Sequence, residues 1–413
     1  MRSGFGAGMN RLFRRLVFGV SLGLLVVLLG GEFGLRAVRA GSDDKGAYRQ
    51  IEVYSEVLKK IQTDYVTVPS VPDVTAGALH GLVESLDSDS SYLSASEYKI
   101  YKERPSGGSA QVGMTISKRF GYAVVVSVLP DSPAAKAHFT DGDVIVAIDG
   151  HSTRELSPAL LDVMLEGKAG SEVTLSVLRP RKTEPDKVAL TRVAAEAPPM
   201  GVQQYEGDTI LYLKPEVLTA ARVDEIAARI KTMVGAMVGS QDKGKDRKIV
   251  LDLRDVSTGG AEQGLRLANL FLKQGTLATL SGQKFPTQTF TADPKAFVTD
   301  APLAVLVNRG TAGAAELAAA ALGDDKRADV VGERTFGDDS VQKTMELPDG
   351  AAVILTVATY ASPSGKKIME EAVTPTVVVG STEDQDVDAE TPAAPKSDET
   401  LDKALELLKA KAA

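Results

Sequence analysis

From residue 200 onward the chain alternates short apolar strand patterns with amphipathic helix patterns, and this order restricts the fold more than any other feature of the sequence. Each of three patterns that predict a strand is followed by one that predicts a helix. The strand patterns cover 209–215, 248–255 and 302–310, and the helix patterns cover 219–238, 261–272 and 314–322. This alternation predicts an α/β sheet, much of it parallel, whose strand-end loops form the functional site.

The residues before this region predict two further parts. The stretch 46–100 predicts two helices separated by prolines, the second at 75–98 and ending in an Asp/Ser turn. The first helix has one apolar face, formed by Ile51, Tyr54, Val57, Leu58 and Ile61. Residues 106–197 change to the period of strands, with short helices at 131–137 and 156–167, and therefore predict a small β-rich module.

Charge and residue counts exclude several classes of protein. The chain has 413 residues with 47 Lys and Arg against 55 Asp and Glu, a net charge of -8, which argues against nucleic acid as the main partner. It has no Cys, so disulfides, thiolate nucleophiles and Cys-ligated metals are excluded. The three His residues, His80, His138 and His151, have a spacing that fits no metal motif. We therefore expect no metal and no other cofactor.

The N-terminus predicts export from the cytoplasm. Arg11, Arg14 and Arg15 precede the apolar run 16–31, which is the pattern of an export signal. The segment is either retained as an inner-membrane anchor or cleaved after Ala40. In both cases the basic residues stay on the cytoplasmic side, and the rest of the chain is expected in a periplasmic or other extracytoplasmic space.

Residues 308–322 predict a strand that ends in a tight turn and launches a helix. Asn308 and Gly310 are turn formers, and the small residues that follow include a single carboxylate, Glu316. Enzymes place nucleophiles at such turns because the turn lifts one side chain above the sheet. This turn has no Ser and no Cys, and we expect its one hydroxyl, that of Thr311, to cap the turn.

Several segments, in order, resemble motifs of the carboxyl-terminal processing peptidases, also called tail-specific proteases. The first, "SLDSDSSYL" (85–93), resembles the family's S-L-D-P-H-S-S-Y-L. The others are "DLRDVSTGG" (252–260, D-L-R-x-N-x-G-G), "NRGTAGAAE" (308–316, N-x-G-S-A-S-A-S-E), "GERTFGDDSVQ" (332–342, G-x-x-T-F-G-K-G-x-V-Q) and "YASPSGKKI" (360–368, Y-x-T-P-x-G-x-x-I). This resemblance covers nearly the whole chain after the export signal.

The resemblance implies a multidomain α+β and α/β fold. It consists of an N-terminal helical segment, a PDZ-like β-rich module and a mixed α/β, ClpP/crotonase-like peptidase core. The expected parts are a signal peptide or anchor (1–40), a helical region (41–105), the PDZ-like domain (106–197), the peptidase-like core (198–380), and an acidic linker with a C-terminal helix (381–413).

The same resemblance implies that the reactive groups are missing. In this family a Ser attacks the peptide carbonyl, a neutral Lys takes its proton, and a Gln holds the Lys. The nucleophile position falls on Gly313 and the Lys position on Asp338, while the Gln is retained as Gln342. We therefore predict that no catalytic pair is intact.

Other groups near these positions leave alternatives open. Thr311, Ser340 and Lys343 are the nearest hydroxyls and amine, and Asp338 and Asp339 with Glu316 or Asp255 form a possible cation site or acid/base pair. Backbone donors of the turn are predicted to persist as an oxyanion-type site. The residues expected to form this oxyanion and turn site are Gly310, Thr311, Ala314, Gly259 and Gly260.

The PDZ resemblance implies a peptide-binding groove. Residues 111–116 match the loop whose N–H groups capture a C-terminal carboxylate, followed by a strand edge on which a peptide can pair. The helix near 157–165 is expected to form the other wall. The predicted peptide-contacting residues are Val112, Gly113, Met114, Thr115, Ile116, Leu160, Leu161 and Met164.

Three hypotheses for function follow. The favoured one is an exported, non-catalytic relative that binds polypeptide C-terminal tails as a scaffold or regulator, in complex with an active paralogue or with copies of itself. The second is an active serine-type endopeptidase that cleaves exported proteins near their C-termini. The third is a different hydrolase that uses the acidic residues and a metal. The residues at 313 and 338 favour the first.

Overall fold

A computed structural model describes residues 48–104, 110–119, 121–179, 182–235, 247–380 and 397–411. The predicted export segment, residues 1–40, and most of the predicted acidic linker lie outside these residues. The chain divides into two compact units, residues 1–75 and 76–413. Among the described residues, no helix has the length and apolar character needed to cross a membrane.

The helical N-terminal region is confirmed, but the predicted helix at 75–98 is wrong in its second half. A helix covers 48–64, and α2 covers Val71–Glu84. The chain then turns, because the Asp87 carboxylate accepts the N–H groups of Asp89 and Ser90. The elements after this turn are β1 (Ser91–Leu93) and α3 (Ala95–Glu103). The predicted Asp/Ser turn is therefore present, but it separates α2 from β1 and α3 instead of ending a helix at 98.

The module after α3 is an open β-sheet with two edge strands. Its strand order is β3 (Met114–Arg119), β4 (Tyr122–Val128), β5 (Val144–Ile148), β7 (Glu172–Leu178), β8 (Asp186–Thr191), with β6 (His151–Ser152) paired to β5. Two short strands, β2 (Ala110–Gln111) and β9 (Val193–Ala194), pair with each other. The module's helices are α4 (Pro133–Lys136) and α5 (Pro158–Leu165). Strand β3 lies at one edge and contacts α5.

The predicted α/β sheet is present, and all its neighbours are parallel except one pair. Its order is β10 (Gly201–Tyr205), β11 (Ile210–Lys214), β12 (Lys248–Asp252), β15 (Leu303–Val307), β16 (Ala328–Gly332), β19 (Val377–Val378). Only β10 runs antiparallel to its neighbour. The strands alternate with α6 (Ala220–Gly235), α7 (Ala261–Asn269) and α8 (Ala314–Asp324), as predicted.

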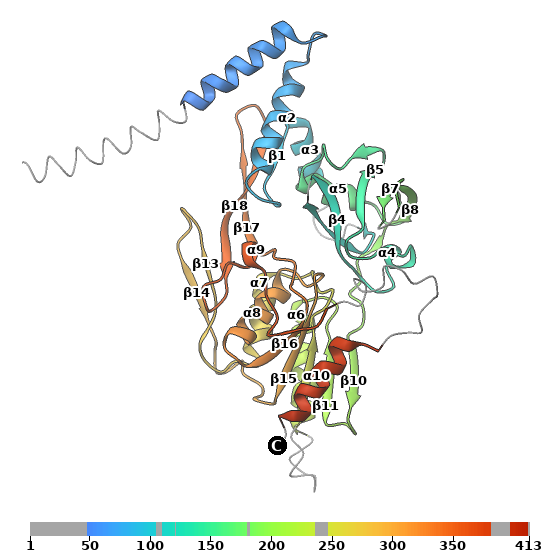
Figure 1. Cartoon of the computed structure of the whole chain (residues 1–413), viewed down its shortest axis with the longest axis vertical. Coiled ribbons are helices and arrows are strands. Elements are labelled where there is room, and N and C mark those ends of the chain that lie inside the picture. The colour runs from blue at the N-terminus through green and yellow to red at the C-terminus, as the bar shows by residue number, and fades with distance from the viewer. Residues whose placement is uncertain are drawn as a thin grey trace, which may run out of the picture. The chain divides into compact units, whose positions relative to one another are not determined.

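Both faces of this sheet are covered, which explains the continuous apolar runs in its central strands, such as β15. Leu251 and Val305 face one side, in a core shared with α6, α7 and α8. Val250 and Leu306 face the other side and pack against α10 (Glu399–Ala410). Figure 1 shows α10 lying along β15 and β16.

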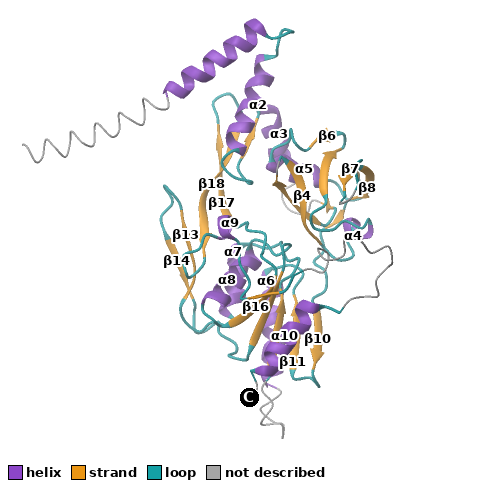
Figure 2. Ribbon diagram, viewed as in Figure 1, coloured by secondary structure: helices purple, strands orange, loops and turns teal. Residues whose placement is uncertain are grey.

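A second sheet, which the sequence patterns did not predict, lies beside the first core. Its order is β1, β18 (Ala352–Ala361), β13 (Thr276–Ser281), β14 (Gln288–Thr291), with β17 (Ser340–Glu346) also paired to β18. A short helix, α9 (Ile368–Glu371), follows β18. Figure 2 shows these strands as long ribbons separate from the parallel sheet. Its strands carry many polar residues, so their apolar period is weak.

The C-terminal helix is attached to the sheet by two ion pairs of Arg254, with Asp252 and Asp398, which we call the latch. The Arg254 guanidinium binds the buried Asp252 at 2.6 Å and Asp398, the N-cap of α10, at 2.7 Å. Asp252 also accepts the Tyr212 hydroxyl at 2.7 Å. At the other end of the helix, the Lys248 ammonium donates to the Leu408 carbonyl at 2.6 Å. The latch therefore fixes α10 across the strand end that leads into the site.

We expect Arg254→Ala to lower the free energy of unfolding by about 3 kcal/mol, because it leaves the fully buried Asp252 carboxylate without its cation. Urea unfolding followed by circular dichroism measures this. The control is Lys403→Ala, which removes only the exposed pair with Glu406 and should cost less than about 1 kcal/mol. Equal losses in the two variants would contradict the latch.

Candidate functional site

The turn between β15 and α8 is held by its own polar side chains. The Asn308 amide oxygen accepts the N–H groups of Asp255 at 3.0 Å and Gly310 at 3.1 Å. The hydroxyl of Thr311 is fully buried, accepts the Asn308 N–H and donates to the Leu253 carbonyl at 2.8 Å. Thr311 therefore caps the turn, as the sequence predicted, and its hydroxyl does not face a substrate.

Gly313 occupies a backbone conformation that is strained for other residues. Its φ is 57° and its ψ is -121°. A side chain there costs about 1–3 kcal/mol in backbone strain. Space is not the limit, because a Cβ would meet only the Asp338 carbonyl, at 3.6 Å. The position thus has the geometry of a turn that presents a side chain, and the glycine presents none.

Glu316, in the first turn of α8, joins this turn to the loop before β17. Its fully buried carboxylate accepts the N–H groups of Gly313 at 3.1 Å, Gly337 at 2.7 Å and Asp338 at 2.9 Å, and the hydroxyl of Thr335. Burial raises the pKa of Glu316, and these hydrogen bonds oppose that shift. The sequence marked Glu316 as a motif position but did not reveal this role.

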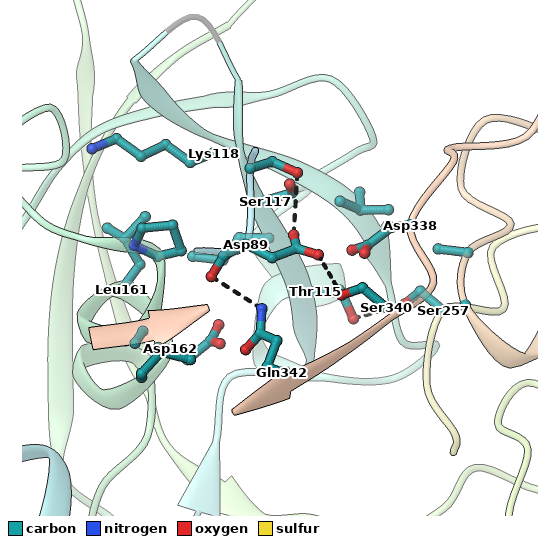
Figure 3. Close-up of a pocket in the computed structure, with 18 of the residues that line it drawn as sticks. Asp89, Thr115, Ser117, Lys118, Leu161, Asp162, Ser257, Asp338, Ser340 and Gln342 are labelled. Atoms are coloured by element: carbon teal, nitrogen blue, oxygen red, sulfur yellow. Dashed lines mark hydrogen bonds between the residues drawn. The ribbon is translucent and has the colours of Figure 1, made fainter. Parts of the chain in front are cut away.

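The three predicted catalytic positions line one cavity. Gly313, Asp338 and Gln342 all border a cavity of about 510 Å³. Figure 3 shows Asp338 and Gln342 in this cavity. Gln342 donates to the backbone carbonyl of Asp89 at 3.0 Å. Asp89 comes from the turn before β1, and it lines the cavity too. The resemblance offered a signal for it: Asp89 stands where the quoted motif has His.

The cavity is strongly acidic. Burial, followed by the carboxylate of Asp89, raises the pKa of Asp338 to about 8. Burial, followed by the charges of Glu316 and Asp89, raises the pKa of Asp339 to about 8. Asp162 on α5 lines the same cavity, and its pKa is raised to about 6, first by burial and then by Glu166. With a pKa of about 8, Asp338 and Asp339 largely hold their protons at neutral pH, whereas Asp162 is largely ionised.

No Ser or Thr hydroxyl that lines the described cavity has a free ammonium beside it. Lys118 lines it, but its ammonium binds Glu84 at 2.6 Å and the Leu156 carbonyl at 2.7 Å, and it points away from Asp338 in Figure 3. The Ser340 hydroxyl donates to the Asp89 carboxylate at 2.9 Å. Lys343, the next candidate amine, is exposed and is not among the lining residues. A Ser–Lys pair is therefore absent from the described cavity.

The predicted oxyanion and turn residues lie near the cavity without lining it. The N–H groups of Gly310 and Thr311 donate to Asn308 and so are used within the turn. Ala314 is the first residue of α8, and Gly259 and Gly260 precede α7. Of the turn itself, only Ala312 and Gly313 border the cavity in the described structure. An oxyanion role for the five residues stays a prediction.

The acidic residues do not converge as metal ligands. Asp255, one of the predicted partners, accepts the Asn308 amide N–H at 2.8 Å in the turn and does not line the cavity. Within the described ranges, no three His, Asp or Glu side chains are placed to hold a metal ion. A metal-dependent mechanism therefore has no support from the geometry of these carboxylates.

The PDZ-like groove opens into the same cavity. Thr115 and Ile116 on β3 and Leu161 on α5, three of the residues predicted to contact a peptide, line it. Thr115 also accepts the hydroxyl of Ser257, from the loop after β12, at 2.7 Å. The edge strand of the module and the turn at Gly313 therefore border one continuous space.

The other predicted groove residues do not line this cavity. Val112 is buried in the module core, and Met114 and Met164 pack against that core. Leu160 packs against Leu93 and Tyr98. Gly113 lies so close to Ser132 that a Cβ would come within 2.2 Å of its side chain. A carboxylate-binding role for residues 112–114 stays a prediction.

Comparison with known proteins decides the family. Residues 222–379 match peptidase family S41, and residues 110–190 match the PDZ domain. The carboxy-terminal-processing protease of Bartonella bacilliformis is 30% identical over 342 residues, which cover 82% of this chain and 77% of that protein. This chain belongs to peptidase family S41.

Other relatives of this S41 chain agree in sequence and in structure. The carboxyl-terminal-processing protease of Picosynechococcus is 34% identical over 292 residues, 70% of this chain and 68% of that protein. The structure of the photosystem II D1 C-terminal processing protease matches with a TM-score of 0.63 and 26% identity, covering 78% of this chain and 86% of that one. The predicted resemblance and the predicted mixed α/β fold with a PDZ module are therefore confirmed.

We expect Glu316→Gln to lower the free energy of unfolding by about 3 kcal/mol. A Gln side chain accepts through one oxygen and sets its own N–H donors against the backbone N–H groups that Glu316 binds. Thermal and urea unfolding measure the change. The matched control is Glu262→Gln, in the exposed first turn of α7, where we expect a change within about 0.5 kcal/mol.

The acidic cavity predicts that stability falls as pH rises. A folded-state pKa of about 8 means that folded Asp339 holds a proton that the unfolded chain releases near pH 4. The contribution of Asp339 to the free energy of unfolding therefore falls as the pH rises from about 4 to about 8. We expect Asp339→Asn to stabilise the protein by roughly 1–3 kcal/mol at pH 8.5 and little at pH 5. Urea unfolding at both pH values measures this, with the exposed Asp208→Asn as control. If Asp339→Asn changes the free energy of unfolding equally at pH 5 and pH 8.5, the prediction is wrong.

Proposed function

We propose that this S41 chain is a non-catalytic member of its family that binds polypeptide tails as a scaffold or regulator. The observation that carries the proposal is Gly313, at the turn where the family's nucleophile is expected. The cavity beside it holds Asp338 where the family's Lys is expected.

The chemistry of a Ser–Lys pair supports this reading. A Lys accepts a proton from Ser only when its pKa is lowered, so that the amine is neutral. The cavity has the opposite character, because Asp89, Asp339 and Glu316 surround position 338 with carboxylates. Even an amine placed there would be held in its charged form. The loss of the base thus extends beyond one side chain to its surroundings.

The binding role rests on the PDZ module and its edge strand. An extended peptide can add to the β3 edge through backbone hydrogen bonds, with its side chains reaching Ile116 and Leu161. The relatives are named for processing carboxyl termini. We extend that substrate class to this chain as a ligand: the C-terminal tail of a polypeptide.

The cellular setting is part of the same proposal. The basic and apolar N-terminal pattern places the chain in an extracytoplasmic space, such as the periplasm, either anchored by residues 16–31 or released after cleavage. There it would act with an active paralogue or with copies of itself. We also propose that the domains of the chain have the predicted bounds, which are 41–105, 106–197, 198–380 and 381–413.

We expect the native chain to be inert as a peptidase and to bind tails. Incubation with a loosely folded protein at pH 5, 7 and 9, followed by mass spectrometry of the products, should show no cleavage. Peptides with a free C-terminus should bind more tightly than their amidated forms in fluorescence anisotropy. The triple variant Gly313→Ser/Asp338→Lys/Asp339→Gly, which restores the family residues at these three positions and removes two acids, tests whether the scaffold still supports chemistry.

Cleavage by the native chain at a rate comparable with an active relative would overturn the proposal. Failure to bind either peptide form would remove the tail-binding part. Strain at position 313 predicts that the single variant Gly313→Ser loses about 1–3 kcal/mol of stability, so unfolding curves must accompany the assays.

A further inference from the structure

Three aspartates that depart from the quoted family motifs meet in one place. Asp89 stands where the first motif has His, Asp338 where the fourth has Lys, and Asp339 where it has Gly. The three residues come from two segments about 250 positions apart in the sequence, and all three line the cavity beside Gly313. The departures therefore replace two basic groups and a neutral one with carboxylates at a single site.

This cluster is incompletely satisfied by the protein itself. Asp339 is 7% exposed, and one of its carboxylate oxygens has no hydrogen-bond partner in the described structure. The hydroxyl of Ser117 on β3 is likewise buried without a partner there, and Ser117 lines the same cavity. Buried acceptors without donors are costly and rare in folded proteins. Their position on the cavity wall indicates that a ligand supplies the donors.

Charge balance also points to a cationic ligand. The charged groups that raise the pKa of Asp338 are Asp89, Glu316 and Asp339, all carboxylates. The nearby ammonium of Lys118 is paired with Glu84. The Arg104 guanidinium lies over the ring of Tyr101, and its charge acts on Asp162. Among the described residues, the main charges acting on Asp338 and Asp339 are carboxylates and include no Lys or Arg, so this cluster lacks a balancing positive charge.

The shape of the site favours a side chain over a metal ion. A cavity of about 510 Å³ is larger than one ion needs and falls within the range of ligand pockets. The described carboxylates do not converge as metal ligands do. One wall is the β3 edge, where an extended peptide can pair, and a guanidinium carries five N–H donors for separated acceptors.

We propose that the cavity bordered by Asp89, Asp338 and Asp339 receives an Arg or Lys side chain of a polypeptide bound along β3. This rests on the proposed tail-binding function and adds a specificity to it. A residue of the bound polypeptide supplies the positive charge that the chain's own sequence lacks at position 338. The retained S41 scaffold thereby acts as a receptor for basic tails.

Proton linkage gives the proposal a distinctive signature. Cation binding favours the ionised form of Asp338 and Asp339, so it releases the protons that they hold below about pH 8. The affinity for an Arg peptide should therefore rise between pH 6 and pH 9, while Arg itself does not titrate. The other titratable groups beside Asp338 and Asp339 are Asp89, Glu316 and Tyr360. Each of them is either negative or neutral, so none supplies a positive charge.

The test is an arginine scan of a simple tail. Eight-residue alanine peptides with a C-terminal leucine and a free carboxylate carry one Arg at each position in turn, and a matched series carries Gln. Binding to the purified full chain is measured by fluorescence anisotropy. At pH 8.5 we expect at least one Arg peptide to bind about tenfold more tightly than its Gln match.

Matched variants locate the effect. In Asp338→Asn/Asp339→Asn the Arg advantage should fall to about twofold or less, while binding of the Gln series stays as in the native chain and reports an intact groove. In Glu172→Gln, which removes one exposed carboxylate from β7 of the same module, the advantage should persist.

Each other outcome has a defined meaning. Equal binding of the Arg and Gln series by the native chain overturns this inference and leaves tail binding standing. Failure of both series overturns the proposed function as well. An Arg advantage that survives the double variant places the cation elsewhere and overturns the inference. Calcium ions that bind the native chain but not the double variant, and that displace the Arg peptide, would identify a metal site instead.

Discussion

The buried carboxylate of Glu316 is the interaction on which the rest of the site depends. A carboxylate removed from water is tolerated only when hydrogen bonds replace its hydration. Glu316 obtains them from the turn at Gly313 and from the loop 335–338, and it therefore fixes these two segments to each other. Its place in the first turn of α8 adds the favourable field of a helix N-terminus.

This arrangement separates the shape of the site from its chemistry. The groups that hold the turn, Asn308, Thr311 and Glu316, all take part in internal hydrogen bonds. None of them is the predicted nucleophile or base. The residues at 313 and 338 can therefore change while the backbone of the turn and of the neighbouring loop keeps its conformation. Glycine at 313 also relieves the strain that a side chain would carry there.

The PDZ module and the peptidase core share one polar junction beside the cavity. The Ser257 hydroxyl, from the core, lies between Thr115 and Ser127 of the module. Strand β3 consequently borders the cavity with its edge directed toward the turn of the core. In an active relative this arrangement would deliver a bound tail to the nucleophile. Under the proposed function, a tail bound along β3 of this chain reaches a group of carboxylates instead.

The carboxylates change what the cavity can bind more than they change the fold. Asp338 and Asp339 repel each other, Asp89 and Glu316, and the resulting penalty grows with pH. The folded state therefore contains unfavourable electrostatic repulsion at this site. A bound cation is the simplest means of lowering it, since it needs no rearrangement of the scaffold.

The sequence by itself determined the order of strands and helices in the core, the module before it, and the identity of the residues at 313, 338 and 342. Apolar period and turn residues are local properties, and motif positions are read directly from the chain. The strands of the second sheet were not predicted, because their polar residues weaken the apolar period. Thr311 was predicted correctly as a turn cap, because turn-forming residues are recognised locally in the sequence.

Only the tertiary structure decided which distant residues meet. Asp89 and Asp338 are far apart in sequence, and their shared cavity depends on β1 pairing with β18 and on β17 returning beside it. The four donors of Glu316 and the sequestered ammonium of Lys118 likewise depend on long-range packing. Such contacts have no local signature, because burial and pairing are properties of the folded chain as a whole.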